Sequence, residues 1–195
     1  QLVKRILNLV PELKQLRLSS IDCAEITNDF WPLLEETRLM PPLHLSLQAG
    51  NDLILKRMKR RHNRQKAINF CRKVRSLRND VVFGADIIAG FPTETNQMFL
   101  NSKKILTECG LTYLHIFPYS NRPNTPASKM PQISNKVIKE RTKLLIIEGN
   151  KIMQRFLKNQ VNKKHKVLFE SETEGHSENF VPIKILTKHS KLVNL

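Results

Sequence analysis

Short apolar runs alternate with helix-like segments over roughly the first 120 residues of the chain. Four runs are apolar enough to be covered on both faces and are predicted to be β-strands: residues 15–19, 43–48, 81–88 and 111–119. Helical spacing of apolar residues predicts helices between them: residues 28–39, 52–58 continuing into 64–77, and 95–109. Alternating βα units of this kind predict an α/β fold with a parallel sheet, as a barrel or an open sheet.

The pattern changes after the fourth run. A proline-rich passage, a long helix and two short β-like runs around a polar turn follow, at residues 118–131, 134–160, 165–171 and 180–186. The proline-rich passage is too irregular to be one element and too long to be a tight turn, which is typical of a functional loop. We therefore predict two domains, an α/β unit over residues 1–160 and a small β-module over 161–195.

The third predicted strand ends in a pattern that suits a ligand site. Gly90 lets the backbone approach a ligand closely, and Pro92 stiffens the turn that places Glu94 above the carboxyl edge of the strand. Ligands of α/β proteins bind at that edge. A plain strand-to-helix turn, with Thr93 as the helix cap, explains the same residues equally well.

The second predicted strand carries polar residues at alternate positions. His44, Ser46 and Gln48 should point to one side of it, since successive strand side chains alternate between faces. Three polar side chains on one face require a polar ligand or one another. Both a binding site and an internal hydrogen-bonded cluster remain open at this point.

Charge adds a candidate partner. The chain has 33 Lys and Arg against 17 Asp and Glu, a formal net charge of +16, which indicates an extended polyanion such as nucleic acid, or simply a generically basic protein. Six basic residues lie between positions 56 and 64: Lys56, Arg57, Lys59, Arg60, Arg61 and Arg64. Such a run suits a phosphate backbone, but it also suits a solvated face. The loop over 117–127, with Arg122, could stack on bases or act as a rigid connector.

The spacing of cysteines and histidines and the hydropathy pattern argue against disulfides, zinc-type motifs and membrane spans. Cys23, Cys71 and Cys109 are 48 and 38 residues apart, which matches neither a disulfide framework nor a close-spaced metal motif, so we expect reduced thiols. The histidines lack zinc-type spacing, and His62, His115 and His165 are predicted to be local hydrogen-bonding groups. No apolar run is long enough to span a membrane, and no secretory leader is recognisable, so we expect a cytoplasmic protein without a membrane partner.

Taken in order, five segments resemble the later core of the radical-SAM methylthiotransferases: LRLSSID, HLSLQAG, RMKRRH, DIIAGFPTET and FPYSNRPNTPASKMP. The likeness is greatest to the branch that modifies N6-threonylcarbamoyladenosine beside the tRNA anticodon. Residues 170–180 are similar to the TRAM module, a small β-barrel that holds RNA. The resemblance implies the last four strands of a partial (β/α) radical-SAM barrel, followed by a truncated TRAM-like barrel.

The resemblance also implies cofactors and roles. The family binds S-adenosyl-L-methionine (SAM) and 4Fe-4S clusters, but the close-spaced cluster cysteines are absent from this chain. By motif match, Ser46 and Gln48 would line the SAM pocket and Arg60 would engage the SAM carboxylate. The strand edge against the nucleoside would be formed by Asp86, Ile88, Gly90 and Glu94. The residues expected to contact tRNA are Lys59, Arg61, Arg122, Lys163, Lys164 and Lys166.

The implied function is therefore tRNA methylthiolation by a chain that lacks its own cluster ligands. We expect a fragment, a decayed remnant, or one half of a split enzyme whose separately encoded N-terminal half carries the cysteines. Three alternatives stay open: a relative acting on isopentenylated adenosine in tRNA or on a ribosomal-protein aspartate, a non-catalytic RNA-binding remnant, and a metabolic barrel enzyme.

Overall fold

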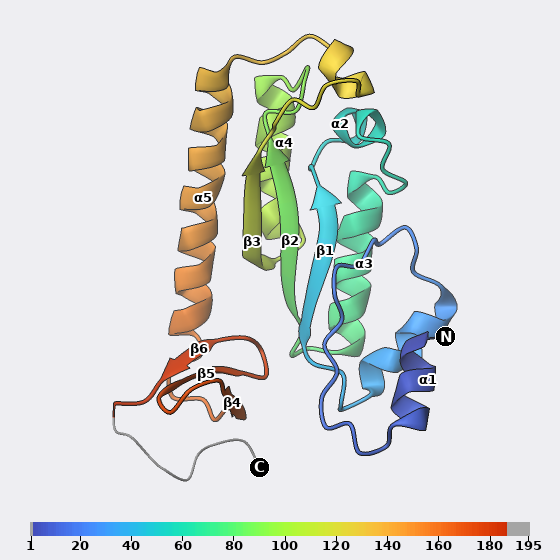
Figure 1. Ribbon diagram of the computed structural model, residues 1–195, viewed down its shortest axis with the longest axis vertical. Coiled ribbons are helices and arrows are strands. Elements are labelled where there is room, and N and C mark those ends of the chain that lie inside the picture. The colour runs from blue at the N-terminus through green and yellow to red at the C-terminus, as the bar shows by residue number, and fades with distance from the viewer. Residues whose placement is uncertain (1, 187–195) are drawn as a thin grey trace.

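A three-stranded parallel sheet forms the centre of the molecule (Figure 1). The structure is a computed structural model and describes residues 2–186. The strands of the sheet are β1 (Pro42–Gln48), β2 (Val82–Ala89) and β3 (Leu111–Pro118), in spatial order β1-β2-β3. Each crossover between them contains a helix, as parallel pairing requires. The predicted α/β class with a parallel sheet is confirmed.

Two helices cover one face of the sheet. In Figure 1, α3 (Arg64–Leu77) lies behind β1, and α4 (Asn96–Glu108) lies behind β2 and β3. On α3 the predicted apolar face is buried except for its last member, Leu77, which is 46% exposed. Thr95, rather than Thr93, caps α4, because its side chain accepts a hydrogen bond from the Met98 N–H. The long helix α5 (Asn135–Lys158) packs along β3 at the edge of the sheet.

The N-terminal elements differ from the prediction. Helix α1 (Leu2–Leu9) is followed by an extended passage in which residues 15–19 form no strand; only isolated bridges join Leu16 to Leu39 and Ile21 to Leu45. Leu16 bonds to Arg38 and Met40 just before β1, and Ile21 bonds to His44 and Ser46 of β1, so the passage follows the β1 edge through two separate bridges and not as a continuous strand. The sheet therefore has three of the four expected strands.

Two predicted helices are also shorter than expected. The first is a 3₁₀ helix, η1 (Asn28–Glu35), which contains Pro32, a residue that lacks the N–H a helix interior requires. The second ends early as α2 (Asp52–Arg57), and a loop separates it from α3. The proline-rich passage holds a single short turn of 3₁₀ helix, η2 (Pro126–Lys129).

The tail forms a separate antiparallel sheet of β4 (Val167–Phe169), β5 (Glu174–Ser177) and β6 (Pro182–Lys184). The predicted polar turn thus contains β5, which apolar periodicity could not reveal. Gly175 permits this strand, since a Cβ there would lie 2.2 Å from the Leu168 carbonyl oxygen. Through residue 186 the tail is an open sheet, and residues 187–195 of the predicted module lie outside the described part.

Phe180 joins the tail to the parallel sheet. The guanidinium carbon of Arg17 lies 4.1 Å from the centre of its ring, and the His176 ring stacks on it at 4.5 Å. Tyr113 of β3 contacts the Phe180 ring edge-on, and its hydroxyl donates a hydrogen bond to the Asn179 carbonyl at 3.0 Å. One aromatic side chain therefore connects three segments that are distant in the sequence.

We predict that Phe180→Ala releases the tail from the sheet. Truncating a half-buried aromatic side chain should lower the free energy of unfolding by roughly 1–3 kcal/mol, part of the cost seen for fully buried Phe. Hydrogen exchange should accelerate in β5 and β6, while β2 stays protected. Leu168→Ala is the matched control, because Leu168 lies in the same sheet but is 52% exposed; equal effects of the two variants would contradict the predicted anchor.

Candidate functional site

Strand alternation separates a covered face of the sheet from a more open one. Leu43, Leu45 and Leu47 of β1 are buried, whereas the residues between them, His44, Ser46 and Gln48, are partly exposed. The same alternation in β2 leaves Asp86 and Ile88 partly exposed. The predicted polar face is confirmed, and two hollows open along it.

The first hollow, which we call the carboxyl-end hollow, has a volume of about 350 Å³ and lies at the carboxyl ends of β1 and β2. Its lining brings together three residues predicted to contact SAM or the nucleoside, Gln48, Arg60 and Ile88, with Lys59, a predicted tRNA contact. Its other lining residues are Arg57, Met58, Phe91, Thr125, Pro126 and Ala127. The proline-rich loop thus closes one side of this hollow, so its prediction as a functional loop has a structural basis.

Arg60 is held rigidly at the wall of the carboxyl-end hollow. One of its terminal nitrogens donates hydrogen bonds to Asp22 Oδ2 at 3.0 Å and to the Ser46 carbonyl oxygen at 2.9 Å. Its Nε is buried and has no hydrogen-bond partner. The Nε is therefore closed off from the hollow, and the second terminal nitrogen, which makes no hydrogen bond to the described residues, is the donor left for a ligand with an acceptor oxygen.

The turn after β2 is built around Glu94 and a helix contact. Gly90 has φ 76°, and a Cβ there would lie 2.7 Å from Ile138 of α5. The Gly90 N–H donates to Glu94 Oε2 at 3.1 Å, and Arg141 donates to the same oxygen at 2.9 Å. Burial raises the pKa of Glu94, although Arg141 and the Gly90 N–H oppose the rise.

This arrangement corrects the expectation for Glu94. Its side chain is 1% exposed and points into the protein toward α5, so it cannot line the nucleoside side of the strand edge. Gly90 likewise serves close packing against α5, at a backbone conformation that favours glycine.

The second hollow, which we call the central hollow, has a volume of about 510 Å³ and surrounds Asp86. Asp86 Oδ1 lies 2.9 Å from His44 Nε2 and 3.2 Å from His115 Nδ1. Asp86 therefore lines a different hollow from Gln48, Arg60 and Ile88. His115 is a local hydrogen-bonding group as predicted, but its convergence with His44 could not be read from residues 71 positions apart.

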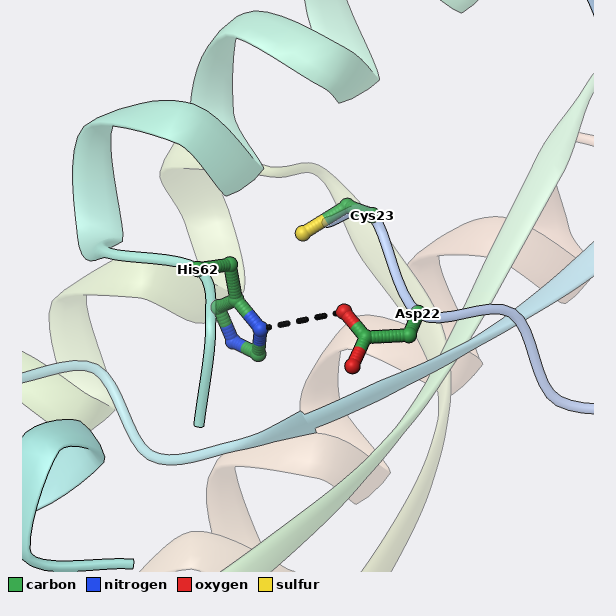
Figure 2. Close-up of side chains that lie close together, drawn as sticks. All are labelled: Asp22, Cys23 and His62. Atoms are coloured by element: carbon green, nitrogen blue, oxygen red, sulfur yellow. Dashed lines mark ion pairs between the residues drawn. The ribbon is translucent and has the colours of Figure 1, made fainter. Parts of the chain in front are cut away.

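Asp22, the partner of Arg60, belongs to a third cluster, with Cys23 and His62 (Figure 2). Burial acts to raise the pKa of Asp22, but the Ala24 N–H, Arg60 and His62 outweigh it and hold this pKa below its usual value. Burial also raises the pKa of the Cys23 thiol to about 11. No sequence pattern predicts this cluster, because its members lie in two separate loops.

The basic residues fall into two groups. Lys59, Arg122, Lys163, Lys164 and Lys166 are exposed. Within the run over 56–64, in contrast, three arginines form ion pairs: Arg60 with Asp22, Arg61 with Glu25, and Arg64 with Glu108. The run is therefore partly engaged in holding loops together and is not one free cationic face.

The three cysteines do not suit an iron–sulfur cluster. Cys71 and Cys109 are fully buried, and Cys23 lies in the separate group with Asp22 and His62. Cluster ligation requires thiolates that converge on one centre. The residues of this chain therefore do not fit a 4Fe-4S cluster.

Comparison with known proteins places this architecture in a family. Residues 3–106 match the model of the Radical SAM superfamily. The chain belongs to the radical SAM superfamily. Its relatives include threonylcarbamoyladenosine tRNA methylthiotransferase MtaB of Rickettsia prowazekii, 52% identical over 95% of this chain and 44% of that protein. The MtaB of Aquifex aeolicus is 34% identical over 88% of this chain and 42% of its own length.

Other relatives are named for a different modified adenosine in tRNA. The tRNA-2-methylthio-N(6)-dimethylallyladenosine synthase of Orientia tsutsugamushi (strain Boryong) is 34% identical over 84% of this chain and 36% of its own length. The expected resemblance to radical-SAM methylthiotransferases of the MtaB type is confirmed. The chain spans less than half the length of these curated relatives.

Solved structures agree on the fold. Coproporphyrinogen III oxidase (HemN) from Escherichia coli, a radical SAM enzyme, superposes with a TM-score of 0.57 at 18% identity, over 80% of this chain and 36% of its own. The radical SAM methyltransferase TsrM from Kitasatospora setae gives 0.53 at 15% identity, over 65% of this chain and 25% of its own. The partial radical-SAM fold is thereby confirmed. No helix within residues 2–186 is long and apolar enough to cross a bilayer.

We predict that Arg141→Met destabilises the fold strongly. It removes the partner of a buried carboxylate, which typically costs about 3–5 kcal/mol because one charge stays buried alone. Urea unfolding would measure the change. The double variant Arg141→Met with Glu94→Gln should recover part of the loss, and a single variant within about 0.5 kcal/mol of wild type would contradict the assigned role of this pair.

Proposed function

We propose that this chain supplies the C-terminal part of the radical SAM core of a tRNA methylthiotransferase acting on N6-threonylcarbamoyladenosine. The observation that carries this substrate is the 52% identity to the Rickettsia prowazekii MtaB over 95% of the chain. Relatives named for the dimethylallyladenosine reaction reach 33–34%. Other MtaB proteins also reach only 34%, so dimethylallyladenosine is the second candidate substrate.

The carboxyl-end hollow is the proposed SAM site. In this superfamily, SAM bound to a reduced cluster supplies the radical. Arg60, oriented through one terminal nitrogen by Asp22 and the Ser46 carbonyl, has its other terminal nitrogen left to hold the SAM carboxylate. Gln48 offers amide groups to the polar end of the ligand, and Ile88 an apolar wall. Ser46 acts in this proposal through its backbone carbonyl.

The central hollow is proposed to receive the adenosine. Asp86, with His44 and His115 on either side, presents a carboxylate and two imidazoles on neighbouring strands. Such groups hydrogen-bond the edges of a base. The cluster itself would be held by another segment, either N-terminal in a longer protein or separately encoded, because the cysteines of this chain do not fit it.

The exposed basic residues are the proposed RNA contacts. Lys163, Lys164 and Lys166 open the tail and leave their charges at the surface, and Arg122 and Lys59 extend from the loops at the carboxyl end of the sheet. Arg61 is 65% exposed and can contribute, although it also pairs with Glu25. The net charge of +16 supports a polyanionic partner.

Reconstitution in cells tests the proposed activity. The chain would be co-expressed with the N-terminal part of the Rickettsia prowazekii MtaB, in a host that lacks its own enzyme, and tRNA nucleosides would be analysed by mass spectrometry. We expect 2-methylthio-N6-threonylcarbamoyladenosine only when both parts are present. Ile88→Trp, which fills the carboxyl-end hollow, should abolish the product, whereas Leu100→Trp on the exposed side of α4 should not.

Other outcomes of this experiment are equally informative. The 2-methylthio derivative of dimethylallyladenosine alone would transfer the proposal to the second substrate. A soluble, stable complex without any methylthiolated nucleoside would favour the non-catalytic remnant.

The RNA surface predicts a specific salt dependence. Each neutralised phosphate on a duplex contributes about 0.9 to the slope of log affinity against log salt. Lys163→Ala with Lys164→Ala should therefore lower the slope by about one to two for tRNA. The matched control, Lys4→Ala with Arg5→Ala, removes two exposed charges from α1 and should leave the slope unchanged; equal slopes for all three proteins would exclude the tail as an RNA contact.

A further inference from the structure

Asp22, Cys23 and His62 form a compact group from two separate loops. A carboxylate oxygen, a sulfur and a ring nitrogen, one from each residue, all lie within 4.8 Å of one another. Figure 2 shows the three side chains converging, with Asp22 and Cys23 on the passage before η1 and His62 on the loop before α3. The His62 side chain is 0% exposed, so its surroundings are entirely protein.

The hydrogen bonding of His62 is incomplete. Its Nε2 lies 3.1 Å from the Leu47 carbonyl oxygen, and a carbonyl only accepts, so Nε2 must carry the hydrogen. Nδ1 lies 3.4 Å from Asp22 Oδ1, is buried, and has no hydrogen-bond partner. In the neutral ring this nitrogen presents a lone pair to a carboxylate, which is unfavourable in a buried position; either a second proton on the ring, giving an ion pair with Asp22, or a metal ion between the two atoms removes the conflict.

We propose that these three residues bind one divalent metal ion of the zinc type. A thiolate, an imidazole nitrogen and a carboxylate oxygen together are a ligand set that zinc accepts in four-coordinate sites, with the fourth position left for water. The surrounding contacts are those of a metal site: the Leu47 carbonyl orients the imidazole, while Arg60 and the Ala24 N–H hold the carboxylate.

The site is distinct from the two hollows and from the family's iron–sulfur chemistry. A single cysteine cannot hold a 4Fe-4S cluster. The other group with metal-ligand chemistry, His44, Asp86 and His115, needs no ion, because both imidazoles already hydrogen-bond to Asp86. The inference therefore rests on the unpartnered nitrogen of His62 and does not depend on the proposed function.

Metal binding here would fix the position of Arg60. The ion would connect the passage at Asp22 to the loop of His62, two residues after Arg60, and Arg60 itself already donates to Asp22. The proposed role is structural: the ion fastens two loops that the ion pairs Arg60–Asp22 and Arg61–Glu25 already join.

Cobalt substitution of the purified 195-residue chain tests the site. After chelation, Co²⁺ titration should give one equivalent of binding, with the intense near-ultraviolet band of a thiolate ligand, and Zn²⁺ should displace it. Cys23→Ser should abolish this band. The matched controls Cys71→Ser and His115→Gln, which alter a buried thiol and an imidazole outside the group, should retain it.

A second measurement uses only the unaltered chain, so it does not depend on a variant folding. X-ray absorption at the zinc edge should show one sulfur ligand with nitrogen and oxygen ligands, and zinc should raise the Tm of the chain. A folded chain without the cobalt band, or with the band unchanged by Cys23→Ser, would overturn the proposal. So would a zinc shell without sulfur, or nitrogen-15 resonances showing His62 doubly protonated in the presence of zinc.

Discussion

Burial of every second strand residue against α3 and α4 is the constraint from which the functional surface follows. Leu43, Leu45 and Leu47 must face the helices, and the period of two then directs His44, Ser46 and Gln48 to the opposite side. The parallel register extends this order across the sheet and sets Asp86 beside His115. A slip of one residue would place imidazoles in the apolar layer. Packing on one face therefore determines the chemistry on the other.

The contacts around Asp22 extend this order beyond the sheet. Its carboxylate accepts hydrogen bonds from Arg60 and the Ala24 N–H and lies beside His62, so two loops meet at one residue. Arg60 consequently reaches the carboxyl-end hollow with one of its two terminal nitrogens already occupied. A preoriented guanidinium loses less conformational entropy when it binds a ligand than a free one.

The sequence predicted the elements with long, regular patterns and failed where tertiary contacts decide. Helix α3 and strand β1 follow from apolar spacing alone, and Gln48, Arg60 and Ile88 do converge on one hollow. The run over 15–19 has strand-like composition, but it meets the edge next to β1 only at isolated bridges, and no local pattern records that interruption. The role of Glu94 could not be predicted either, because its partner Arg141 lies 47 residues away on α5.

The contact between Arg17 and the Phe180 ring couples the tail to the central hollow. Arg17 holds the Phe180 ring on one side and forms part of the wall of the central hollow on the other. Arg17, together with Tyr113 on β3, thus couples the tail to the part of the sheet around Asp86. By thermodynamic reciprocity, whatever fills the central hollow and shifts Arg17 must also change how firmly the tail is seated. The two sheets share no strand, yet the contact between Arg17 and Phe180 couples binding at one to the packing of the other.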